Sequence, residues 1–122
     1  MTDDEAMALG LRAVACKGFR WMGGMKDMQG RTVTPCILFR AHPSDVPDFR
    51  DPATLGCLLA LVREAWNAPR ALVRLSANGK SFHVFDVDRV TTGGNWAAWL
   101  CGDRILQTEA EALVAALEAA PA

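Results

Sequence analysis

The sequence predicts a single α+β domain, in which an antiparallel sheet packs against helices in the order αββαβββα. Three observations lead to this prediction. Capping boxes open a helix near each end of the chain, an aspartate–proline cap opens an apolar helix in the middle, and an Asn-Gly pair joins two β-rich segments. The chain has 122 residues, of which 51% are hydrophobic and 22% charged, as in ordinary globular domains. We therefore expect residues 1–122 to fold as one domain.

Capping boxes predict the first and last helices. A Thr-x-x-Glu box opens a helix over residues 3–16, in which Met7, Leu11 and Val14 recur at helical spacing. The same box, starting at Thr108, opens a C-terminal helix with a buried apolar stripe. In each box a hydroxyl and a carboxylate can satisfy amides of the first turn that have no partner within the helix.

The middle helix is predicted from Asp51, which can cap it, and from Pro52, which suits the first helical position. Its apolar stripe consists of Leu55, Leu58, Leu59, Val62 and Trp66. Further apolar residues extend around the helix. Residues 55–66 are therefore expected to form either a central helix or one whose free face meets a partner, including a second copy of the chain in a homodimer.

Five strands are expected from β-branched, aromatic and alternating residues that lie between turn signals. They cover residues 19–28, 31–40, 71–76, 81–89 and 96–101. Gly30 supplies the first turn and Asn78-Gly79 the second, because these residue types tolerate positive φ. Pro35 lacks an amide hydrogen, so its strand is expected at a sheet edge or bulged there. Residues 41–50 are expected to form a loop.

Charge and hydropathy argue against two classes of protein. The chain has 13 basic and 14 acidic residues and a net charge of −1, whereas nucleic-acid binders usually concentrate positive charge. No apolar run reaches the roughly 18 residues that span a bilayer, and the acidic start is unlike a signal peptide. A cytoplasmic protein is therefore expected. The four cysteines lack zinc-like spacing and are expected to be buried free thiols.

Two helical segments resemble parts of a known group of proteins. The segments are DPATLGCLLALVREAWNAP, from Asp51 to Pro69, and TEAEALVAALEAAP, from Thr108 to Pro121. They resemble segments of small uncharacterised proteins that are encoded by tailed phages and prophages of proteobacteria. The resemblance implies an accessory protein that acts inside a bacterial host, and it assigns no functional residue.

Tryptophan and methionine residues form the predicted partner-binding site. Trp96 and Trp99 lie on opposite faces of one expected strand, and a thin domain with one covered sheet face cannot easily bury both. Trp21 lies beside Met22 and Met25 in a glycine-containing segment. Exposed tryptophan and methionine are typical of protein interfaces, so these five residues are predicted to contact a partner.

Two groups of side chains have the chemistry of metal ligands, but neither is predicted to bind a metal. Met22-x-x-Met25-x-x-Met28 has a spacing suited to Cu(I), yet copper sites of this kind belong to exported proteins. The methionines are instead interpreted as core residues or as adaptable partner contacts. The second group lies in the 41–50 loop and its end, lacks the pattern of an EF-hand, and is interpreted as a solvated loop. It consists of His42, Asp45, Asp48 and Asp51.

No catalytic residues and no cofactor are predicted. Strand alternation places Asp86 and Asp88 on one face and His83 on the other, so the three do not form an acid–base pair. The glycine-rich segment 91–95 opens a strand rather than a helix and is interpreted as a turn. None of the three serines, Ser44, Ser76 and Ser81, lies in the sequence context of a nucleophile elbow.

The function expected from these observations is non-enzymatic. The protein is predicted to be a phage or prophage accessory protein that binds a host protein. One form of this function is the inhibition of a host defence system, as anti-CRISPR or anti-restriction proteins do. One alternative is a nucleic-acid-associated protein that uses a local basic cluster. That cluster comprises Arg12, Lys17, Arg20, Lys26 and Arg31. Residues 52–120 also share the element order of a double-stranded RNA-binding domain, but the last helix starts with glutamates that would repel phosphate. The other alternative is a metal-binding protein or enzyme whose site is assembled from scattered residues.

Overall fold

The computed structural model describes residues 1–33, 45–76, 79–86, 88, 100 and 106–121. These residues form three helices and a two-stranded antiparallel sheet. The elements are α1 (Asp3–Val14), α2 (Pro52–Ala65), β1 (Leu72–Leu75), β2 (Phe82–Phe85) and α4 (Glu109–Ala119). The α+β class is confirmed.

All three predicted helix starts are confirmed by their caps. The Thr2 hydroxyl accepts a hydrogen bond from the Glu5 amide, and the Thr108 hydroxyl accepts one from the Glu111 amide. Asp51 caps α2 by accepting from both the amide and the hydroxyl of Thr54. These bonds depend only on neighbours in the chain, which is why the sequence alone located them.

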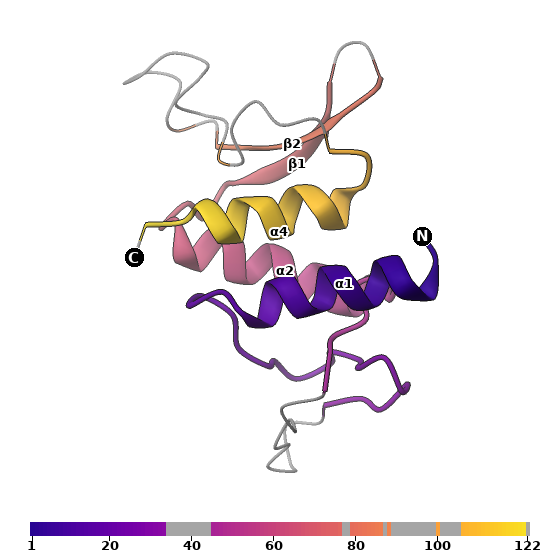
Figure 1. Ribbon diagram of the computed structural model, residues 1–122. Coiled ribbons are helices and arrows are strands. Elements are labelled where there is room, and N and C mark those ends of the chain that lie inside the picture. The colour runs from indigo at the N-terminus through magenta and orange to yellow at the C-terminus, as the bar shows by residue number, and fades with distance from the viewer. Residues whose placement is uncertain (34–44, 77–78, 87, 89–99, 101–105, 122) are drawn as a thin grey trace.

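The three helices lie side by side and run in the same direction, so their C-terminal ends meet at one end of the domain (Figure 1). An ion pair and a hydrogen bond join these ends. Arg12 of α1 pairs with Glu118 of α4, and the Trp66 indole after α2 donates to the Ala116 carbonyl of α4. Parallel helices bring like ends of their dipoles together. Acidic residues in the first turns of α1 and α4, and arginines in the last turns of α1 and α2, offset this effect.

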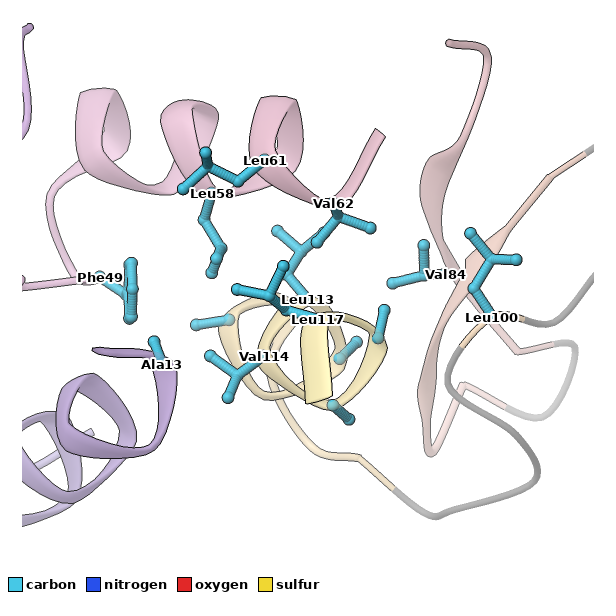
Figure 2. Close-up of a cluster of buried hydrophobic side chains, with 14 of the residues drawn as sticks. Ala13, Phe49, Leu58, Leu61, Val62, Val84, Leu100, Leu113, Val114 and Leu117 are labelled. Carbon is cyan, nitrogen blue, oxygen red and sulfur yellow. The ribbon is translucent and has the colours of Figure 1, made fainter. Parts of the chain in front are cut away.

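Helix α4 lies at the centre of the hydrophobic core. Seven of its residues are buried, against α1, α2 and the sheet. Figure 2 shows Leu58 and Val62 of α2 above Leu113 of α4, whereas Val84 of β2 lies to the right of α4 and Ala13 of α1 to its lower left. The alanines of α4 are small enough for its neighbours to approach closely, so a single helix packs against three elements.

Helix α1 packs through small residues. Its buried residues are Ala6, Leu9, Gly10 and Ala13. A Cβ atom on Gly10 would lie 2.2 Å from Val46 Cγ1 and 2.6 Å from the Pro47 carbonyl oxygen. The stripe by which the sequence identifies this helix, which includes Met7 and Leu11, therefore lies on the side facing away from the core.

The predicted hairpin around Gly79 is confirmed as β1 and β2, which pair with Leu72 opposite Phe85 and Leu75 opposite Phe82. Strand β2 also bonds on its other side, because the Phe82 amide donates to the Leu106 carbonyl and the Leu100 amide to the Val84 carbonyl. Strand β2 is thus hydrogen-bonded along both of its edges, to β1 on one side and to Leu100 and Leu106 on the other. The expected strand 96–101 lies outside the described residues, except for Leu100.

The expected strand over residues 19–28 is wrong. Within the described residues this segment makes isolated bridges, Lys26 with Thr32 and Asp27 with Pro47, and no extended ladder. The Asp27 carboxylate accepts from the amides of Gln29 and Arg31, which stabilises a tight turn instead. The turn at Gly30 is confirmed by its φ of 84°. Residues 34–40 lie outside the described residues.

The expectation of a solvated loop at 41–50 is also wrong for its described part. Asp45, Val46, Pro47 and Phe49 are buried. The Met28 amide donates to the Val46 carbonyl, and the loop fills the space beneath α1. Val46, Pro47 and Phe49 are thus part of the buried interior.

The close approach at Gly10 predicts opposite effects of one substitution at two helical glycines. Gly10→Ala places a methyl group against the Pro47 backbone and is expected to destabilise the protein by about 2–3 kcal/mol, as overpacking does. At Gly56 of α2 an added Cβ meets nothing within 4 Å, so Gly56→Ala is expected to stabilise by about 0.5–1 kcal/mol. Urea denaturation measures both. Equal effects at the two positions would contradict this packing.

The Asp51 cap predicts a stability change in acid. Hydrogen bonds from the Thr54 amide and hydroxyl hold the pKa of Asp51 below its ordinary value. Its contribution is therefore complete above the unfolded pKa of about 3.9 and is lost as the pH falls through the lower folded pKa. Asn also caps but does not titrate, so Asp51→Asn is expected to lose less stability than the wild type below about pH 4. Melting temperatures of the wild type and of Asp51→Asn, measured between pH 2 and 7, test this prediction. If the two melting temperatures fall in parallel as the pH is lowered, the Asp51 carboxylate does not contribute to acid sensitivity.

Candidate functional site

The structure places the sequence-predicted partner-binding residues in different surroundings. Met25 is 0% exposed and belongs to the core, so its prediction as a surface contact is wrong. Trp21 and Met22 are partly buried and pack against the same core, and Trp21 meets Phe19 edge to face. Trp96 and Trp99 lie outside the described residues.

Met25 is buried because the backbone around it is fixed on both sides. The Val33 amide donates to the Met25 carbonyl, and the Gly24 amide donates to the Val33 carbonyl. Gly24 adopts a φ of 95°, which turns the chain inward, and the Met25 sulfur accepts a hydrogen bond from the Met22 amide. The thioether is thus used within the fold.

The carboxylates of the predicted loop do not converge on one point. Asp45, together with the buried Asp27, binds Arg31, whose guanidinium donates to both carboxylates at 2.8 Å. Asp48 pairs with Arg50, which lowers the pKa of Asp48, and Asp51 is the α2 cap. In the part of the chain that the structure describes, no three His, Cys, Asp or Glu residues are grouped as a metal site would require. His42 lies outside that part.

His83, Asp86 and Asp88 are arranged differently from the strand alternation expected for them. Strand β2 ends at Phe85, and Asp86 then accepts a hydrogen bond from the Asp88 amide, which begins a turn. Asp88 pairs with Arg70 at 3.0 Å. The two aspartates therefore stabilise the exit from the strand.

Three members of the predicted basic cluster are bound to carboxylates. Arg12 pairs with Glu118 at 2.6 Å, and Arg20 pairs with Glu64 at 2.7 Å. Arg31 lies between two aspartates. These pairs offset the positive charge that phosphate binding would need, which weakens the nucleic-acid alternative.

The outward side of α1 carries the candidate site. Its exposed apolar residues include Leu11, at 48% exposed, and Met7, at 38%. We define the α1 surface as Met1, Met7, Ala8, Leu11 and Ala15, all of which are exposed. Large apolar side chains that gather on one helix face differ from scattered surface residues, because together they offer a contact area.

Two hollows border the α1 surface along its contact with α4. The larger, of about 550 Å³, opens where the C-terminal ends of the three helices meet. Its wall includes Cys16, Lys17, Ala65 and Leu117. The smaller, of about 190 Å³, lies toward the helix N-termini, and Arg12 contributes to both. The α1 surface is therefore bordered by concave regions in addition to offering apolar area.

The thiol in the larger hollow is poorly suited to nucleophilic chemistry. Burial raises the pKa of Cys16, and Glu118 nearby raises it further. Its Sγ donates to the Arg12 carbonyl at 3.4 Å. A thiol with a raised pKa stays protonated near neutral pH, whereas the thiolate is the nucleophile. Cys16 is therefore not an activated thiol.

Sequence reasoning missed the α1 surface, although its signal is present in the sequence. Met7 and Leu11 define one side of the helix, and small residues at positions 6, 10 and 13 define another. Apolar periodicity assigns the large residues to the core by default. Here the small residues permit the closer packing and so take the buried side.

Comparison of the chain with protein families, with curated proteins and with solved structures found no match. Among the described residues, no helix combines the length and apolar character needed to cross a membrane. The assignment of a function therefore depends on the surfaces described above.

The raised thiol pKa predicts slow alkylation. At pH 7.5, Cys16 is expected to react with iodoacetamide several-fold more slowly than a free cysteine, because its thiolate fraction is smaller, and the rate should rise steeply above about pH 9. Burial also raises the pKa of Cys57, which should behave alike. Peptide mapping by mass spectrometry measures each site, with protein in urea as the control. Rapid modification of Cys16 near pH 7 would indicate an activated thiol.

Proposed function

We propose that the protein is a non-catalytic accessory protein that binds a protein of its host, with the α1 surface as the main contact. The observation that carries this proposal is the exposure of Met7 and Leu11 on one face of a helix whose opposite face is fixed in the core. Unbranched methionine adapts to the shape of a partner, and apolar helix faces commonly dock in grooves or against other helices.

The α1 surface is held rigidly, which favours binding. Gly10 fits closely against residues 46–47, and the Arg12–Glu118 pair joins α1 to α4. Arg50 also pairs with Asp3 at the start of the helix. A surface that is ordered before binding loses less conformational entropy when it meets its partner.

The biological form of this proposal is a phage or prophage protein that acts in the cytoplasm of a bacterial host and blocks a defence system of the anti-CRISPR or anti-restriction type. The resemblance of residues 51–69 and 108–121 to phage-encoded proteins supports this form. The small size of the chain and its near-neutral charge are consistent with a protein-binding inhibitor.

A variant in the α1 surface and a matched control variant outside it test the proposal. Leu11→Glu places a charge in the α1 surface and is expected to reduce capture of the partner from bacterial host lysate at least tenfold, because a buried unpaired carboxylate opposes docking. Ala53→Glu introduces the same charge at an exposed residue of α2 and should leave capture unchanged. Quantitative mass spectrometry of the captured proteins measures both variants.

Circular dichroism and the melting temperature serve as controls, since Leu11 and Ala53 are both exposed and both variants should fold. Capture that survives Leu11→Glu, or that Ala53→Glu abolishes equally, would refute the α1 surface as the contact. A plasmid-interference or phage-plating assay in a host with active CRISPR or restriction systems tests the anti-defence form separately.

A further inference from the structure

Strand β1 has an edge whose backbone groups point away from the sheet. The Ser76 amide donates to the Ser81 carbonyl, so the residues opposite each other at this position form a hydrogen-bonded pair. In an antiparallel ladder such pairs alternate, and Arg74 opposite His83 is therefore the next one. It follows that the amide and carbonyl groups of Val73 and Leu75 face outward, away from β2.

The bonds on the far side of β2 support this assignment. The Phe82 amide donates to the Leu106 carbonyl, and the Val84 carbonyl accepts from the Leu100 amide. The backbone amide and carbonyl groups of the even-numbered residues of β2 therefore point away from β1. At the start of β1 the outward carbonyl of Ala71 is occupied by Arg63 of α2, at 2.8 Å. Beyond it, no bond from another described residue reaches the outward groups of Val73 or Leu75.

The side chains along this edge do little to block pairing. Leu75 is 53% exposed and Leu72 is 36% exposed. Proteins usually protect sheet edges with prolines, bulges or inward-pointing charges, and the four residues of β1 include neither proline nor a bulge. Arg74 is its charged residue, and its guanidinium lies over the Phe85 ring at 5.0 Å from the centroid.

The geometry points to a second binding site at this edge, where an extended segment of another protein adds to the sheet as an antiparallel strand next to β1. An added strand places one residue directly opposite Arg74 and the two flanking residues opposite Val73 and Leu75, on the other face. The recognised segment is therefore apolar–acidic–apolar. Its carboxylate pairs with Arg74, and its apolar side chains cover Leu75.

Charge favours a different protein over a second copy of this chain. The two-fold antiparallel register that uses every outward group of both β1 strands pairs Val73 with Leu75 of the other copy, and it sets two Arg74 side chains directly opposite each other. Like charges in that position destabilise a strand pair.

Strand addition is tested with two synthetic ten-residue peptides, one with a Val-Glu-Val centre and one with a Val-Lys-Val centre, titrated into the full ¹⁵N-labelled chain. We expect the acidic peptide to bind at least threefold more tightly, with shifts and slower exchange of the Val73 and Leu75 amides. Arg74→Glu should reverse the preference between the peptides. Leu11→Glu, which alters the α1 surface, should change neither affinity.

Leu75→Pro provides a sharper variant. Proline removes an outward amide that β2 does not use, so the β1–β2 pairing should persist while strand addition weakens at least fivefold. Equal affinity of the two peptides, unaffected Val73 and Leu75 amides, or undiminished binding by a folded Leu75→Pro variant would overturn the proposal. So would concentration-dependent dimerisation through the same amides. If Leu75→Pro does not fold, the reversal by Arg74→Glu still decides the matter.

Discussion

The burial of α4 is the constraint on which the rest of the structure depends. This helix contacts α1, α2 and the sheet at once, and its alanines allow all three to approach closely. Because α1 and α2 both run parallel to α4, the three C-terminal ends gather at one end of the domain (Figure 1). The larger hollow lies there, lined by residues from the ends of the three helices and from the segments that follow α1 and α4. The core thus determines where a binding surface can exist.

Polar groups mostly serve to hold irregular segments onto this core. Two buried aspartates share the guanidinium of Arg31, which fixes the turn after α1 and the loop before α2 against each other. A buried carboxylate is costly unless it is paired, so this arrangement commits these charges to the fold. Asp27, Asp45 and Arg31 are therefore occupied structurally.

The α1 surface and the β1 edge offer different kinds of contact. Side chains dominate the first, where Met7 and Leu11 present apolar area on a rigid helix. Backbone groups dominate the second, where Val73 and Leu75 present amides and carbonyls in a fixed register. A protein with both could hold a folded domain and an extended segment at once, and simultaneous engagement raises the effective affinity when the geometry permits it.

The sequence by itself determined the local features: the caps at Thr2, Asp51 and Thr108 and the hairpin turn at Gly79, because each depends on bonds between residues a few positions apart. It identified none of the α1 surface as exposed, and it counted Met25 among the partner contacts although Met25 is buried. Burial depends on partners distant in the chain, and here Val46 and Pro47 selected the small-residue side of α1. Only the tertiary structure could decide which apolar residues remained for a partner.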